Sequence, residues 1–205
     1  MMFFFWIIAL VIALSIHEYA HARAADELGD PTPRMAGRLT LNPLAHLDPI
    51  GTIALFLFHF GWGKPVPIDP YNLRNPRRDQ AIIALSGPVS NFITAAVFAF
   101  VFRLSGSLAS PYLSSLVVSI VIMNLGLGLF NLLPLGPLDG SKVLLGLLPQ
   151  EKAAEWEEVF SRYGIIFLLI FFLPFPGGGS SLLNLTLIPL LNFFLRLLLP
   201  SASLV

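Results

Sequence analysis

Long apolar stretches separated by polar, proline-rich segments dominate the pattern of this chain. Three apolar runs, at about residues 2–25, 80–102 and 112–133, approach the roughly 20 residues that a helix needs to cross a bilayer. Two shorter runs follow at 164–175 and 182–199. The pattern predicts an all-α polytopic membrane protein with a three-helix core and one or two further transmembrane helices.

A short apolar run lies between the first two long ones. Segments 26–48 and 61–79 are rich in proline, glycine and charge, which argues against helix there. Residues 49–60 (PIGTIALFLFHF) lie between them and are too few for a comfortable span. Basic residues flank this run on both sides, so a spanning helix would put positive charge on both membrane faces. We therefore expect a small re-entrant β element, extended in conformation, that returns to the same face.

The charges of the remaining loops predict an orientation. Loops 104–111 and 176–181 carry no charge, whereas 139–162 contains lysine, arginine and several acids. Basic loops favour the cytoplasm, so we expect the N-terminus outside and the basic segments inside. Residues 151–162 (EKAAEWEEVFSR) should form a cytoplasmic amphipathic helix before the last two spans.

Composition narrows the class of protein further. Of 205 residues, 56% are hydrophobic and 12% charged, with a mean hydropathy of +0.79, against roughly 25% charged in soluble domains. The formal net charge of zero gives no general attraction to nucleic acid. The absence of cysteine excludes thiolate chemistry and sulfur-ligated metals. We expect one membrane-embedded domain over 1–205, with a core at about 2–148 and C-terminal helices at about 151–199. We interpret the first apolar run as a retained transmembrane segment rather than a signal peptide.

A group of ionisable residues ends the first apolar run. His17, Glu18 and His21 (HEYAH) follow an uncharged stretch, although such groups are costly in a membrane helix and usually mark a functional site. On a helix, His17 and His21 project from one face and can bind one metal ion, while Glu18 points toward water on it. Nitrogen and oxygen ligands suit zinc. Pairing of these residues with another helix, without a metal, is the alternative.

A zinc site of this kind needs a third protein ligand. The candidates are His46, His59, Asp48, Asp69 and Asp139. His17 precedes Arg23 by roughly 9 Å of helix, so the site should lie shallowly inside the cytoplasmic boundary. Asp139, just after the third apolar run, lies at a matching depth, which favours it even though Asp-Gly is also an ordinary turn pair. We interpret His46 and His59 as structural or interfacial histidines.

The ordered motifs resemble the site-2 protease family of intramembrane zinc metalloproteases. HEYAH (17–21) is similar to its HExxH motif, and LDG (138–140) within NLLPLGPLDG is similar to its second metal motif. SGPVSN (86–91), GWGKPVPIDP (61–70) and LNPLAHLDPIG (41–51) resemble further elements of its short members. The short loop 104–111 stands where other members insert a PDZ domain, and no CBS-like domain follows, so the resemblance is to a short form.

The resemblance implies roles for particular residues. His17, His21 and Asp139 would bind Zn²⁺, Glu18 would be the general base, and Asn91 would line the site and hold the substrate backbone. The implied activity is hydrolysis of peptide bonds in or near transmembrane segments of protein or peptide substrates. It would take place in the lipid of the cell membrane, near the cytoplasmic side, and serve regulated intramembrane proteolysis or clearance of membrane remnants.

Two other functions use the same residues differently. In a membrane transporter they would form a metal or proton pathway, but the internal repeats common in transporters are not visible here. A catalytically inert relative that binds membrane clients would not need Glu18 together with a full ligand set. The sequence predicts neither the substrate nor the oligomeric state.

Overall fold

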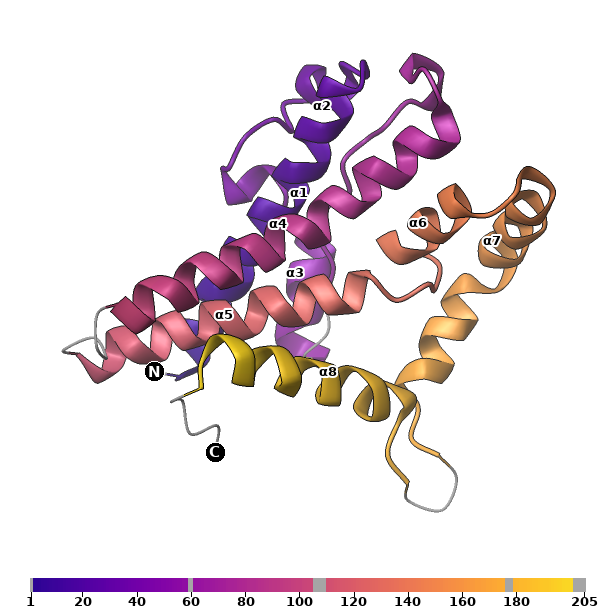
Figure 1. The fold of residues 1–205 in the computed structure, drawn as a ribbon. Coiled ribbons are helices and arrows are strands. Elements are labelled where there is room, and N and C mark those ends of the chain that lie inside the picture. Colours follow the sequence, from indigo (N-terminus) through magenta and orange to yellow (C-terminus); the bar gives the residue numbers. More distant parts are fainter. Residues whose placement is uncertain (1, 59–60, 105–109, 176–178, 201–205) are drawn as a thin grey trace.

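The computed structural model describes residues 2–58, 61–104, 110–175 and 179–200, and Figure 1 shows their arrangement. Within these residues the chain is helical and contains no strand, which confirms the all-α prediction. The elements are α1 (Met2–Glu27), α2 (Thr32–Met35), η1 (Pro43–Ala45), α3 (Pro49–Phe58), η2 (Pro70–Asn72), α4 (Pro76–Leu104), α5 (Pro111–Asn131), α6 (Asp139–Leu147), α7 (Gln150–Phe172) and α8 (Leu182–Leu198).

Helices α1, α4 and α5 pack against one another and form the core (Figure 1). All three are long and apolar enough to cross a membrane. Small residues such as Ala13 and Ala95 are fully buried between them, which lets the backbones approach closely. Large apolar side chains such as Ile93 and Phe100 are instead exposed on the outer face of α4. Because lipid tails accept such side chains, this distribution suits a membrane protein with a small-residue interior.

The C-terminal helices attach to this core at different places. Helix α8 packs along α5, where Leu195 and Leu199 join a cluster with Ala95, Val121 and Leu125. The sequence predicts an amphipathic helix at 151–162 and a separate apolar span at 164–175. In the structure, one continuous helix, α7, contains the first segment and most of the second. No proline interrupts this stretch, so its helical hydrogen bonds continue from the charged half into the apolar half.

Residues 49–58 form helix α3, so the prediction of an extended conformation for this stretch is wrong. Asp48 begins the helix: its Oδ1 accepts from the Gly51 N–H at 2.7 Å, and its carbonyl accepts from the Thr52 N–H at 2.8 Å. Pro49 suits the first helical position, where no N–H is needed. A helix satisfies its own backbone groups, which an unpaired extended segment in an apolar environment cannot do.

The segments before and after α3 nevertheless lie side by side, as expected of a re-entrant excursion. Leu47 and Gly63 form an antiparallel bridge, and the Lys64 N–H donates to the His46 carbonyl at 2.8 Å. The predicted β element is therefore one isolated bridge at the base of α3, within the part of the chain that the structure describes. His59, considered above as a ligand, lies outside the described residues.

A buried aspartate joins the two polar segments around this excursion. Asp30 is fully buried and accepts hydrogen bonds from the Thr32 hydroxyl at 2.5 Å, the Asn72 Nδ2 at 2.9 Å, the Asp69 N–H at 2.8 Å and the Thr32 N–H at 3.0 Å. Burial raises the pKa of the Asp30 carboxyl, but these hydrogen bonds lower the pKa more, so it lies below its ordinary value. The charged form is thus the stabilising one.

We predict that Asp30→Ala lowers the free energy of unfolding by about 1–3 kcal/mol, because the four hydrogen bonds that the buried carboxylate accepts are lost. The carboxylate's contribution is present above the ordinary aspartate pKa and is lost as the pH falls through the depressed value. Thermal unfolding of detergent-purified protein measures the effect. Asp69→Asn, which keeps an oxygen for the Tyr71 N–H, is the control, and equal melting temperatures for the two variants would contradict the prediction.

Candidate metal centre

The HEYAH stretch lies in α1, near the end that leads to the polar segments. Both His17 and His21 are buried, and they stand one helical turn apart on the same face. Their ring centroids are 4.5 Å apart with an interplanar angle of 87°. This perpendicular arrangement lets both Nε2 atoms point to one position beside the helix.

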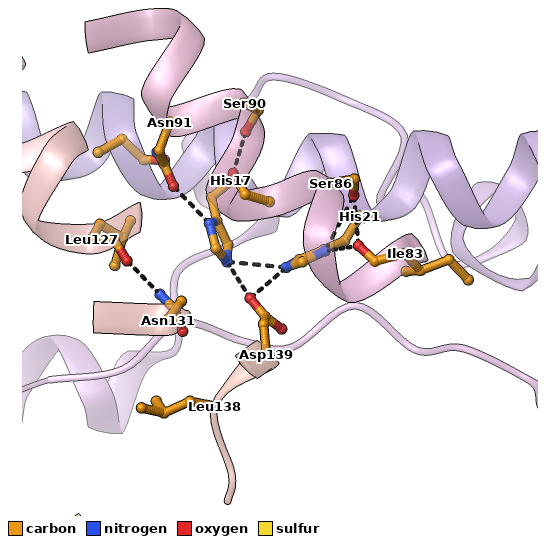
Figure 2. Close-up of polar contacts among 12 residues, drawn as sticks. His17, His21, Ile83, Ser86, Ser90, Asn91, Leu127, Asn131, Leu138 and Asp139 are labelled. Atoms are coloured by element: carbon orange, nitrogen blue, oxygen red, sulfur yellow. Dashed lines mark hydrogen bonds and ion pairs between the residues drawn. The ribbon is translucent and has the colours of Figure 1, made fainter. Parts of the chain in front are cut away.

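Asp139 approaches that position from α6 (Figure 2). Its Oδ2 lies 3.1 Å from His17 Nε2 and 3.2 Å from His21 Nε2, and the two Nε2 atoms are 3.0 Å apart. Ligand atoms around a tetrahedral zinc ion are separated by roughly 3.3 Å, given zinc bonds of about 2.0–2.2 Å. The three atoms therefore form one face of a coordination tetrahedron.

The protons on both imidazoles follow from their outer partners. His17 Nδ1 faces Asn91 Oδ1 at 2.7 Å, and His21 Nδ1 faces the Ile83 carbonyl at 2.7 Å. Both partners only accept, so each Nδ1 must carry the proton and donate it, which leaves a lone pair on each Nε2. Asp139 Oδ2 is buried and has no hydrogen-bond donor. With both rings neutral, three lone-pair atoms converge on one position, an arrangement that fits a bound cation.

Close backbone packing brings Asp139 to this position. The LDG stretch follows α5 after a short turn at residues 132–137, and a Cβ on Gly140 would overlap the backbone carbonyls of Leu132 and Leu133. Glycine is needed here because the turn after α5 folds tightly onto the start of α6. Helix α7 packs behind the same turn, where a Cβ on Gly164 would lie 2.9 Å from the Gly136 carbonyl oxygen.

Glu18 lies beside the cluster on the wall of an open cavity. The cavity has a volume of about 430 Å³. Its walls include His17, His21 and Asp139, and also Trp62, Val66 and Gln80. Among the described residues, Glu18 makes no hydrogen bond or ion pair, so both carboxylate oxygens are available to water or a ligand. The site thus combines three convergent ligand atoms with a neighbouring carboxylate on the wall of one open cavity.

The other ligand candidates lie elsewhere. Among the described residues, only His17, His21 and Asp139 form a group with metal-binding geometry. His46 is buried and donates from Nε2 to the Thr40 carbonyl at 2.7 Å. Asp48 and Asp69 begin α3 and η2 respectively.

Asn91 occupies a different place from the one expected for it. It is fully buried behind His17 and is absent from the cavity wall, so it contacts a candidate ligand rather than the space for a substrate (Figure 2). Asn131 and Lys142 do line the cavity, although sequence analysis assigned them no role. Both residues belong to the same stretch as Asp139, NLLPLGPLDGSK, and this was the feature of the sequence that could have indicated their place at the cavity.

Comparison with known proteins agrees with this geometry. Residues 103–171 match the model of peptidase family M50. The chain is 37% identical over 175 residues to "Putative zinc metalloprotease YwhC" of Bacillus subtilis (strain 168), covering 82% of this chain and 80% of that protein. It is 28% identical over 169 residues to "Putative zinc metalloprotease Rip2" of Mycobacterium tuberculosis, covering 80% of this chain and 64% of the relative. No solved structure matches the chain significantly.

The relative from Bacillus subtilis is 37% identical over 82% of the length of this chain. The family model covers the stretch that carries Asp139. On these grounds the chain belongs to peptidase family M50, the site-2 protease family of zinc metalloproteases.

Proposed function

We propose that this chain is an intramembrane zinc metalloprotease that hydrolyses peptide bonds in or near the transmembrane segments of other membrane proteins. The observation that carries the proposal is the convergence of His17, His21 and Asp139 beside Glu18 on the wall of one cavity. In this proposal the first three residues hold Zn²⁺ and Glu18 is the general base. The names of the relatives support the metal and the reaction class.

The ligand set favours zinc over other common metals. Two neutral imidazoles and one carboxylate are the ligands of hydrolytic zinc sites, which keep a fourth position open. Magnesium and calcium prefer oxygen ligands, and the chain has no cysteine for softer metals. A zinc ion bound here lowers the pKa of water and polarises the carbonyl group of the scissile peptide bond.

Glu18 transfers the proton in the proposed reaction. Its carboxylate takes a proton from water, whose oxygen bonds to the carbonyl carbon of the substrate. The carbon–nitrogen bond then breaks, and Glu18 delivers the proton to the leaving amine, so the base ends in its starting state. Among the residues that the structure describes, no ion pair or hydrogen bond engages this carboxylate, which supports the role, because a carboxylate held in an ion pair is a weaker base.

The surroundings of the site support a substrate that is unwound. The cavity is bordered by α1, by the start of α4 and by residues 62–66 of the returning segment, which contain no helix. A transmembrane helix hides its carbonyl groups in its own hydrogen bonds, so it must open locally before zinc and Glu18 can act. We therefore infer that helix-breaking residues near the cut favour cleavage.

We also propose an orientation and a domain arrangement. The charged segments at both sides of α3 and at the start of α7 lie toward the cytoplasm, so the active site opens near that face of the cell membrane. Residues 2–148 form the catalytic core, and the helices at 151–199 complete a single domain. The contacts of α7 with α6 and of α8 with α5 support this arrangement.

Gly87 in α4 supports the proposed zinc site from behind. A Cβ on Gly87 would lie 2.5 Å from His21 Nε2 and 2.6 Å from His17 Cε1. Real side chains do not approach this closely, so any residue other than glycine must displace both imidazoles. The glycine of the SGPVSN stretch is therefore explained by space for the two histidines.

Glu18→Gln should retain zinc and lose cleavage by a factor of about 10²–10⁴, because an amide cannot accept the proton from water. Zinc content by elemental analysis and cleavage of a transmembrane peptide in detergent measure the two effects. Glu27→Gln, a change of an exposed carboxylate in the same helix, is the matched control. Wild-type cleavage rates in Glu18→Gln would refute the role of the base.

Asp139→Asn should weaken zinc binding on the order of 10–100-fold, because the neutral amide replaces the only charged ligand of the proposed set. Competition with a chelator of known affinity measures the zinc dissociation constant. Unchanged zinc affinity would remove Asp139 from the ligand set. Zinc-dependent ion flux in sealed vesicles, retained by Glu18→Gln, would point to a transporter instead.

Gly87→Ala should reduce zinc affinity by about 10-fold or more, because the added methyl group pushes His17 and His21 away from Asp139. Gly126→Ala in α5 is the control, because a Cβ there meets nothing within 4 Å. The same chelator competition compares the two variants. If both bind zinc as the wild type does, the two imidazoles do not occupy the positions described here.

A further inference from the structure

Two buried asparagine side chains connect α5 to His17 through α4. Asn91 and Asn124 are both fully buried, and neither lies on the cavity wall. Asn91 Nδ2 donates to Asn124 Oδ1 at 2.9 Å, and Asn91 Oδ1 accepts from His17 Nδ1 at 2.7 Å. A continuous chain of hydrogen bonds therefore runs from α5 to a proposed zinc ligand.

Each amide in this chain has its orientation fixed by its other partners. Asn124 Nδ2 donates to the Ile120 carbonyl at 2.9 Å, which turns Asn124 Oδ1 toward Asn91. Asn91 Nδ2 also donates to the Ala13 carbonyl at 3.0 Å, one helical turn before His17. With both of its N–H groups occupied, Asn91 can present only its oxygen to His17.

We propose that Asn91 and Asn124 are positioning residues that hold the proton on His17 Nδ1 and fix the ring, so that Nε2 faces the metal. This inference rests on the proposed zinc site. It assigns Asn91 to the support of a ligand rather than to the binding of substrate, and it extends the zinc site to Asn124, which touches neither a ligand nor the cavity. Partners beyond the ligands commonly set the tautomer and orientation of a metal-bound histidine.

The two histidines differ in this respect. His21 Nδ1 donates to a backbone carbonyl, that of Ile83, which side-chain substitution does not remove. His17 alone depends on side chains, and its support comes from two other helices. Loss of the amide chain should therefore loosen one ligand while the other two remain in place, which weakens zinc binding without abolishing it.

A purely structural role for the pair makes a different prediction. In a purely structural role, amides buried between membrane helices hold the helices together and do nothing else. In that case their loss would lower the stability of metal-free protein and leave the spectrum of the bound metal unchanged. Zinc affinity and the visible absorption spectrum of a cobalt-substituted site are thus readouts that separate the two roles.

The test compares Asn124→Leu with Asn124→Asp in full-length protein. Leucine has a similar branched shape, although it is larger, and offers no acceptor to Asn91. A neutral aspartic acid side chain instead offers a carbonyl to Asn91 and an O–H to the Ile120 carbonyl. We expect Asn124→Leu to weaken zinc binding about 10–100-fold and to alter the cobalt spectrum. Asn124→Asp should restore both to near wild-type values.

Thr94→Val is the matched control. Thr94 is similarly buried in α4, one turn beyond Asn91, and its hydroxyl donates only to the Ser90 carbonyl of its own helix at 2.8 Å. This variant should keep the zinc affinity and the cobalt spectrum of the wild type. Thermal unfolding of each metal-free variant shows whether the fold is retained.

The outcomes separate the inference from the proposed function. A wild type that binds zinc, with Asn124→Leu showing equal affinity and an identical cobalt spectrum, overturns the positioning role and leaves the protease intact. If Asn124→Leu does not fold, Asn124→Asp decides the question. Weakened zinc binding by Asn124→Asp with a stable metal-free fold overturns the positioning role. Wild-type zinc binding by Asn124→Asp supports that role. Absence of zinc binding in the wild type would refute the proposed function, and the inference with it.

Discussion

Three lone-pair atoms held within 3.2 Å of one another in a buried place are a source of electrostatic repulsion. With both rings neutral, the outer hydrogen bonds hold the proton of each ring on Nδ1, so the two imidazole nitrogens that face Asp139 carry lone pairs. A cation relieves this repulsion. The packing of α1, α4 and α6 can be understood as the scaffold that keeps these atoms together.

Each helix makes a distinct contribution to that scaffold. Helix α1 supplies two ligand candidates and the neighbouring carboxylate on one turn of a rigid element. Helix α4 lies directly behind them, and its glycine and asparagine provide space for the rings and an acceptor for one ring nitrogen. Helix α6 begins at the aspartate itself, so the third group is fixed by the start of a helix rather than by a free loop.

The core could be predicted from sequence because bilayer thickness sets the length of a spanning helix. The expected run 112–133 corresponds to α5, and 80–102 lies within α4. Asp139 could be singled out because depth follows from distance along the chain. Charge placement identified the excursion around 49–60 but could not fix its conformation, since charge reports which side a loop occupies rather than how its backbone folds.

The link from Asn124 to Asn91 was not readable in the sequence. The two residues lie on different helices, and which faces meet depends on the packing of the whole bundle. Asn91 was expected from its motif to line the site, but the hydrogen bond to His17 could not be foreseen, because a motif gives residue types and spacing without the direction of the side chain. Cavity residues such as Asn131 were missed for the same reason.

The contact between Gly164 and Gly136 limits how this protein can change over evolutionary time. A side chain at position 164 would separate α7 from the turn that leads to Asp139, so substitution there would be felt at the cluster although the residue lies far from it in sequence. Its neighbours Ile165 and Ile166 are exposed, so the packing of the described residues leaves space for other apolar side chains there. Within one turn of helix, an invariant position should thus stand beside freely varying ones.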